Sequence, residues 1–202
     1  MKLKMRCAGL GLSAVGIFVS AFILFSILNP NFNPIDDYVS KLGALGQPYA
    51  LWWNLIGFGL VGLLLTAFGW CYGYLIQDRL VGILLASFGI GFAATGVPID
   101  LANEVAPVSK AHIVAICLGL AGWMFGLARM GYSMSLERSV RRLANTAATL
   151  LFIPLLGQIA QLWSMPVTHR LVFVVVFGWV LITCIGLKRK SINDTYVDKN
   201  NV

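Results

Sequence analysis

Six apolar runs, each close to the length of a membrane crossing, constrain this chain more than any other feature. A helix needs about 20 mostly apolar residues to cross a hydrocarbon core about 30 Å thick. With 58% hydrophobic and only 11% charged residues, the composition is far from that of a soluble domain. The sequence therefore predicts an all-α integral membrane protein. It is expected to be a six-transmembrane-helix bundle with spans near residues 7–28, 51–75, 81–97, 111–128, 143–164 and 171–187.

Basic residues gather on one side of this topology. Of the 15 Lys and Arg residues, twelve precede the first span, follow the sixth, or lie between spans two and three or four and five. Only Lys41, Lys110 and Arg170 fall on the other side. The positive-inside rule then places both termini in the cytoplasm. We interpret the excess of basic over acidic residues as a sign of membrane topology and of attraction to anionic membrane lipids. We do not interpret it as a sign of nucleic-acid binding.

The chain is expected to form one transmembrane domain, residues 1–190, followed by a polar cytoplasmic tail, residues 191–202. Its connections are too short for a second, soluble domain. The first span is interpreted as a retained anchor, since it is too long for a signal peptide and no small-residue cleavage site follows it. Glycines at close-packing intervals, as at Gly69 and Gly73, allow helix backbones to approach one another in lipid.

Metal and cofactor sites are not indicated. The cysteines are scattered singly and show neither zinc-site spacing nor a disulfide framework. The two histidines, His112 and His169, fall on the same side of the membrane. They cannot supply the stacked pairs that a transmembrane haem relay requires. No metal and no cofactor is therefore predicted, and the sequence gives no indication of the oligomeric state.

The first outer connection carries a helix start signal. Asn33 can cap a helix, a proline suits the next position, and Asp36 and Asp37 fall in the first turn. The sequence predicts a short outer-face helix over residues 34–42. Asp36 and Ser40 would share one helix face, and Asp37 would pair with the lysine four residues later. Two interpretations stay open: a capped surface helix with one ion pair, or a helix whose Asp36 and Ser40 face the bundle mouth.

The second outer connection brings an acidic and a basic residue near each other. Residues 96–100, Gly-Val-Pro-Ile-Asp, end the third span, since proline stops a helix and leaves Asp100 just beyond it. His112 lies in the first turn of the fourth span, where the helix dipole disfavours its protonation. The two side chains could meet at the outer end of one helical hairpin. Two interfacial anchors that hold the hairpin explain them equally well.

The remaining polar residues lie near the outer ends of three spans. Arg170, directly after His169, could extend toward lipid headgroups or hold a phosphate or carboxylate as a bidentate fork. Asn54 lies near the outer end of the second span. Gln158 and Gln161 lie near the outer end of the fifth span, and their spacing predicts one shared helix face. Polar groups in lipid face the bundle interior or a wet cavity, so either interhelical hydrogen bonds or a cavity lining explains these amides.

Several short motifs resemble a known family. They are Ser40-Lys41-Leu42-Gly43 after an acidic loop, Trp53-Asn54 entering the second span, residues 96–100 followed by His112, and Arg170 before the last span. Together they look like the signature of the bacterial and archaeal six-span family called domain of unknown function 998. The resemblance runs from about residue 29 to the sixth span. It implies a bacterial or archaeal cytoplasmic (inner) membrane and joint action at the outer face by Ser40, Asn54, Asp100, His112 and Arg170.

Three functions are consistent with these residues. An enzyme acting on a lipid or amphiphile would use His112 as general base, Asp100 to orient it and Ser40 as nucleophile, with Arg170 on a headgroup phosphate. Asp36, Asn54, Gln158 and Gln161 would then contact the substrate. A lipid or small-molecule binding or translocating protein could use the same groups, although no ionisable residue near the middle of a span supports ion coupling. In a structural or accessory protein, the polar residues would tie the outer loops together.

Overall fold

The computed structural model of the protein describes residues 2–103 and 105–200, with side chains as far as Ser191. Every regular element in this part of the chain is helical. The elements are α1 (Lys2–Leu28), the 3-10 helix η1 (Val39–Gly43), α2 (Ala50–Trp53), the π-helix η2 (Asn54–Leu60), α3 (Val61–Leu75), α4 (Arg79–Ala94), α5 (Pro107–Tyr132), α6 (Arg138–Ile159) and α7 (Met165–Asn200).

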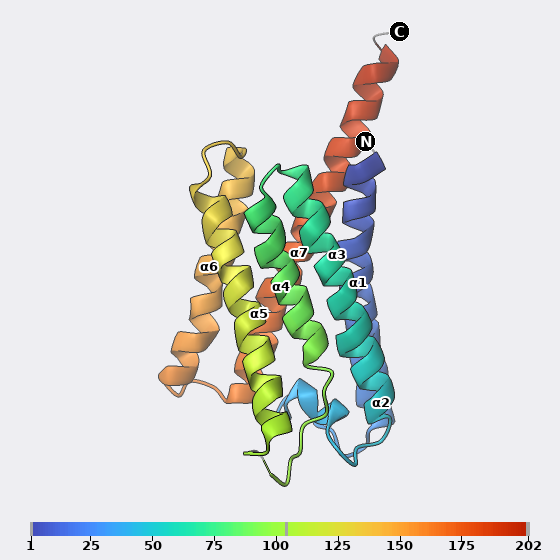
Figure 1. The fold of residues 1–202 in the computed structure, drawn as a ribbon, viewed down its shortest axis with the longest axis vertical. Coiled ribbons are helices and arrows are strands. Elements are labelled where there is room, and N and C mark those ends of the chain that lie inside the picture. The colour runs from blue at the N-terminus through green and yellow to red at the C-terminus, as the bar shows by residue number, and fades with distance from the viewer. Residues whose placement is uncertain (1, 104, 201–202) are drawn as a thin grey trace.

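The long helices form a closed ring in chain order. α1 packs on α3, α3 on α4, α4 on α5, α5 on α6 and α6 on α7, and α7 returns to α1. α1 begins and α7 ends at the same end of the bundle (Figure 1). We call this end, which holds Lys2, Arg79 and Arg138, the basic end. The opposite end, with the connections that begin at Asn29, Thr95 and Ala160, is the loop end.

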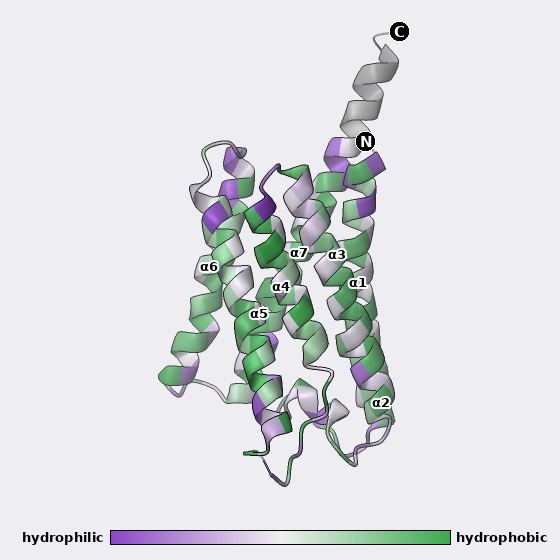
Figure 2. Ribbon diagram, viewed as in Figure 1, coloured by the Kyte–Doolittle hydropathy of each residue, from purple (hydrophilic) through white to green (hydrophobic). Residues whose placement is uncertain are grey.

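Four helical segments are long and apolar enough to cross a membrane: Lys2–Leu28, Ala50–Leu75, Pro107–Tyr132 and Met165–Ser191. α4 is apolar but has 16 residues, and the 22-residue α6 carries arginines in its first turns. Hydrophilic residues concentrate at the two ends of the bundle and hydrophobic residues between them (Figure 2). Large apolar side chains such as Leu63 and Phe125 are exposed along its length. These features indicate a membrane-embedded helical bundle.

Aromatic rings fill the interior of the ring toward the loop end. Phe18 of α1 stacks on Phe177 of α7 with ring centroids 4.5 Å apart, and it meets Phe92 of α4 edge-on at 5.7 Å. Trp53 and Phe58 extend this cluster toward the loops, with ring centroids 5.2 Å apart. All five side chains are buried. Such edge-to-face and stacked contacts fix the rings relative to one another.

Glycines bring α3 and α4 into backbone contact. A Cβ atom on Gly73 would lie 2.2 Å from the Cα of Gly82, and one on Gly69 would lie 2.6 Å from the backbone nitrogen of Ala86. α4 also approaches α5, because a Cβ on Gly91 would lie 2.5 Å from the carbonyl oxygen of Ala115. The predicted close packing at Gly69 and Gly73 is thus used within the chain, between neighbouring helices.

The prediction of one continuous outer-face helix over residues 34–42 is wrong. A single turn follows Asn33, and a separate 3-10 helix, η1, begins at Val39. In a continuous helix the carbonyl of Asp37 would accept from the backbone N–H of Lys41. It accepts instead from the guanidinium of Arg170, at 2.6 Å, and the Lys41 N–H donates to Tyr38. A contact with α7 therefore interrupts the helix that the local sequence favours.

The predicted spans and the observed helices overlap but have different bounds. α5 is longer than the predicted span over residues 111–128, and α6 ends at Ile159, ahead of the predicted bound at residue 164. The expected start of the polar tail, residue 191, falls within α7. Residues 201 and 202 of that tail lie outside the described residues.

The glycine contact between α3 and α4 generates a stability prediction. Gly73→Ala is expected to lower the free energy of unfolding in detergent micelles by about 1–3 kcal/mol, because the new methyl group meets the backbone of α4. Gly16→Ala is the matched control, since no atom lies within 4 Å of a Cβ placed there. The control is expected to be neutral or stabilising by up to about 1 kcal/mol. Equal effects at the two sites would contradict the backbone contact.

Candidate functional site

Asn33 organises the start of the first loop. Its side-chain oxygen accepts from the backbone N–H groups of Ile35 and Asp36, at 2.9 and 3.3 Å. Its amide nitrogen donates to the carboxylate of Asp36, at 2.6 Å. Asn33 therefore caps a turn, as its position predicts. Asp36 is exposed and serves this turn, and no hydrogen bond joins it to Ser40 among the described residues.

The predicted pair of Asp37 and Lys41 is present, with 2.7 Å between the carboxylate oxygen and Nζ. Burial opposes ionisation of Asp37, but hydrogen bonds from Lys41 and the Asn33 backbone and the charges of Lys41 and Arg170 lower its pKa below 3.8. A lowered pKa in the folded state means that ionised Asp37 stabilises the fold at neutral pH. That contribution is lost as the pH falls through the pKa of the folded state.

Arg170 ties this loop to α7. Its two terminal nitrogens donate to the carbonyl oxygens of Asp37, at 2.6 Å, and Pro166, at 2.8 Å. Beside it, the ring of His169 lies against Tyr38, with 5.3 Å between ring centroids. Arg170 was predicted either to contact a lipid headgroup or to bind an anion with both terminal nitrogens. Either role would compete with the two carbonyl oxygens to which these nitrogens already donate.

Asp100 and His112 serve their own segment of the chain. The carboxylate of Asp100 accepts from the backbone N–H of Ala102, at 2.9 Å, and its own N–H donates to the hydroxyl of Ser109, at 3.2 Å. The Nδ1 atom of His112 lies 3.3 Å from the carbonyl oxygen of Val97. Among the described residues, no hydrogen bond joins Asp100 to His112. These contacts hold the α4–α5 connection against the first turns of α5.

Asn54 joins the first loop to the second predicted span. Its amide nitrogen donates to the carbonyl oxygen of Gly43, at 2.9 Å, and the side chain is buried. Gly43 leaves room for this amide, because a Cβ at that position would clash with the Asn54 side-chain oxygen. Asn54 also begins η2, a π-helix, which is a rare form of helix that is frequent at functional sites. The sequence did not indicate this π-helix.

Gln158 and Gln161 do not share a helix face, which corrects the sequence prediction. Gln158 is in the last turn of α6 and accepts from the hydroxyl of Thr168, at 3.4 Å. Gln161 lies beyond the helix, with a left-handed φ of 56°. The N–H groups of Gln161 and Leu162 bond back to Gln158 and Gly157, at 3.1 and 2.9 Å. This pattern is a Schellman motif, whose left-handed position usually holds glycine.

The structure therefore brings the predicted residues to one end of the bundle but gives them separate partners. Arg170 meets the first loop, Asn54 meets the same loop from the other side, and His112 and Asp100 hold the second loop. Ser40 is half-buried in η1, and among the described residues no hydrogen bond joins its hydroxyl to His112 or Asp100. What the contacts of Arg170, Asn54, Asp100 and His112 share is that each one holds a loop in place.

A groove lies at the loop end beside Asn54, with a volume of about 540 Å³. Its walls are the first loop, α2, η2 and the end of α4, and Asn54 alone of the residues lining it has a polar side chain. Leu45, Leu51 and Leu55 line it and are more than half exposed. The backbone N–H of Leu45 donates to the carbonyl of Ile99, at 2.9 Å, and joins the two loops beside the groove.

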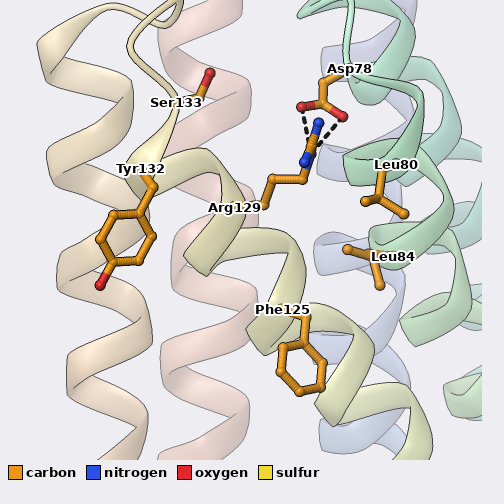
Figure 3. Close-up of a pocket in the computed structure, with 7 residues that line it drawn as sticks. All are labelled: Asp78, Leu80, Leu84, Phe125, Arg129, Tyr132 and Ser133. Atoms are coloured by element: carbon orange, nitrogen blue, oxygen red, sulfur yellow. Dashed lines mark hydrogen bonds and ion pairs between the residues drawn. The ribbon is translucent and has the colours of Figure 1, made fainter.

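A second site, which sequence reasoning missed, lies at the basic end between α4 and α5. Arg129 reaches from α5 to Asp78, and its Nε atom lies 3.0 and 2.7 Å from the two carboxylate oxygens (Figure 3). Asp78 also caps α4 by accepting from the N–H of Val81, at 3.1 Å. The sequence signal that could have indicated this site is Asp78 followed directly by Arg79 at the start of a helix, since aspartate suits the N-cap position.

Metal binding has no support from the described residues, because no three His, Cys, Asp or Glu side chains among them are grouped so as to hold an ion. The polar groups at the loop end are amides, hydroxyls, histidines and ion pairs, and most of them have a partner in the chain. Their chemistry suits hydrogen bonding to a ligand or to a loop.

The fold and these two sites define a class of protein, the helical integral membrane proteins. Residues 12–188 match the family model described as "Protein of unknown function (DUF998)", so the chain belongs to this family. The match begins within the first apolar helix and includes the motifs around Ser40, Asp100 and Arg170, and it confirms the resemblance. No curated protein and no solved structure matches the chain.

The Arg170 clamp generates a prediction about loop dynamics. Arg170→Gln is expected to speed amide hydrogen exchange of residues 29–45 by about tenfold or more, because two charge-assisted hydrogen bonds are lost. Arg170→Lys keeps the positive charge but loses the two-nitrogen geometry of the guanidinium, so its exchange rate is expected to lie between those of the wild type and Arg170→Gln. Lys110→Gln, which removes another cation of the loop end, is the control. Unchanged exchange in Arg170→Gln would show that the loop does not depend on the clamp.

The left-handed residue after α6 generates a second prediction. Gln161→Gly is expected to raise the free energy of unfolding by about 0.5–1 kcal/mol, since glycine adopts this conformation without a steric cost. Gln158→Gly is the matched control and is expected to lower it by about 1 kcal/mol, because glycine is unfavourable inside a helix. Thermal unfolding in micelles measures both. A loss of stability in both variants would contradict the Schellman motif.

Proposed function

We propose that the protein crosses the membrane six times, with both termini in the cytoplasm, and binds a lipid or amphiphile of the outer leaflet at its loop end without catalysing a reaction on it. Twelve of the 15 Lys and Arg residues at the basic end support this orientation. α4 and α6 supply the fifth and sixth crossings, because each packs in the ring between two of the four helical segments that are long enough to cross a membrane. The membrane in question is a bacterial or archaeal cytoplasmic membrane.

The groove beside Asn54 is the observation that carries the binding role. Its volume, about 540 Å³, falls in the range of ligand sites, which are mostly apolar with a few placed polar groups. Its exposed leucines, Leu45 of the first loop, Leu51 of α2 and Leu55 of η2, lie on the outside of the ring, so an acyl chain can enter sideways from the bilayer. The polar loops at its rim would meet the headgroup region.

Catalysis by Ser40, His112 and Asp100 has less support than binding. A general base must come within hydrogen-bond reach of the proton that it removes. The Asp100 carboxylate holds the N–H of Ala102, and the His112 Nδ1 atom faces the carbonyl of Val97. Among the described residues no hydrogen bond joins either group to the other or to the Ser40 hydroxyl, so the three side chains would have to move together before they could act as a unit.

Translocation through the centre of the ring also has less support. The space between α1, α4 and α7 is filled by Phe18, Phe92 and Phe177, which are in ring contact and buried. A ligand that approaches from the loop end would have to displace this cluster. Binding at the lateral groove requires no such change, and it leaves the loop contacts of Arg170 and Asn54 intact.

A photoreactive lipid tests the proposal. A phosphatidylglycerol with a diazirine in its acyl chain, added to the protein in nanodiscs, is expected to crosslink preferentially to residues 44–59 and 93–98. Gly59→Leu should lower this labelling about fivefold, because the added side chain fills the groove. A Cβ on Gly59 meets only the carbonyl oxygen of Asn54, at 3.4 Å, so the substitution fits without a clash at the backbone. Gly178→Leu is the matched control, since a Cβ there has no atom within 4 Å.

Two outcomes would contradict the binding role. One is labelling spread evenly over the exposed helix surfaces. The other is labelling of the groove that Gly59→Leu and Gly178→Leu change equally. Turnover of the lipid by the wild-type protein, abolished in Ser40→Ala or His112→Gln variants that still fold, would instead establish the catalytic alternative.

A further inference from the structure

We propose that the cleft between α4 and α5 at the basic end holds one glycerophospholipid, with its phosphate on Arg129. The cleft has a volume of about 470 Å³. It is a different site from the loop-end groove and lies at the other end of the bundle (Figures 1 and 3). The inference does not depend on the function proposed for that groove.

Arg129 is held in place with most of its donors free. Only its Nε atom contacts Asp78, and no hydrogen bond joins its two terminal nitrogens to another residue in the described part of the chain. The side chain is 48% exposed, whereas that of Asp78 is 17% exposed. Asp78 thus fixes the guanidinium from one side and leaves its other edge open. A guanidinium edge binds a phosphate through two parallel hydrogen bonds.

The rest of the cleft divides into a polar and an apolar part. Ser133 and the backbone of Tyr132 follow Arg129 at the end of α5, with the Tyr132 ring directed away from Asp78, and Leu80, Leu84 and Phe125 line the cleft farther along the two helices (Figure 3). Phe125 is 65% exposed and Leu80 is 46% exposed. A ligand that combines a phosphate with an acyl chain satisfies both parts, and a bilayer supplies such a ligand at high concentration.

The charge of the basic end favours the same ligand. Arg79 follows Asp78 directly, and Arg138, Arg141 and Arg142 begin α6 next to the Ser133 side of the cleft. Juxtamembrane cations attract anionic lipid headgroups. Asp78 compensates one positive charge at the cleft and supplies carboxylate oxygens near the position of the headgroup. A headgroup that carries its own hydrogen-bond donor, such as ethanolamine or glycerol, therefore fits the cleft.

Native mass spectrometry of the delipidated protein, titrated with the anionic lipid dioleoylphosphatidylglycerol, tests the inference. Arg129→Gln is expected to weaken binding of the first lipid by about tenfold or more, because the charged hydrogen bonds to phosphate are lost. Arg189→Gln removes an exposed arginine of the same end that does not line the cleft, and it should leave the affinity for the first lipid unchanged. Dioleoylglycerol, with the same acyl chains and no phosphate, should bind weakly to the wild type and be insensitive to Arg129→Gln.

A second variant separates lipid binding from folding. Leu80→Trp fills the cleft from an exposed position and keeps the Asp78–Arg129 pair, so it should block the lipid while the melting temperature without lipid stays unchanged. The inference is overturned if Arg129→Gln lowers the melting temperature and leaves lipid affinity as it was, since the pair would then be a structural contact. It is also overturned if glycerol 3-phosphate binds as tightly as the lipid, because the ligand would then be a free phosphate.

Discussion

Backbone contact between α3 and α4 fixes the positions of the elements around both sites. Glycines on the two helices, including Gly73 and Gly82, leave no room for side chains between them. α4 meets α5 through Gly91 and Gly119, so three successive helices are set by small residues. In lipid, where apolar burial does not drive association, such close packing supplies the stabilisation. The large side chains lie elsewhere on the helices. Aromatic rings point into the ring of helices, and other large apolar side chains are exposed on its outside.

The filled interior is the reason why we place the proposed ligands on the outside of the ring. Phe18, Phe92 and Phe177 occupy the space beneath the loops, and the polar residues above them fix the loops to the helices. Arg170 and Asn54 act on the first loop from opposite sides. The groove beside Asn54 and the cleft beside Arg129 lie outside this aromatic cluster, and α4 contributes to the walls of both. Lipid is the ligand that we propose for each.

The sequence predicted those features that depend on local or compositional signals. Apolar runs indicated the long helices, Asn33 indicated a capped turn, and the spacing of Asp37 and Lys41 indicated their ion pair. Contacts between distant residues decided the rest. The 34–42 helix is interrupted because Arg170, 133 residues away, takes the Asp37 carbonyl. Likewise, the sequence could not show the partners of His112 and Asp100. Asp100 accepts from the backbone N–H of Ala102, and the Nδ1 atom of His112 lies against the carbonyl oxygen of Val97.

The central claim is that the ring is filled and that its ligands lie outside it. An experimental structure in lipid nanodiscs, at a resolution that places side chains and acyl chains, tests this claim most directly. The account predicts that Phe18, Phe92 and Phe177 remain in contact, with lipid density in the groove beside Asn54. A water-filled cavity that leads from Ser40 into the ring, with Asp100 bonded to His112 at its mouth, would contradict it.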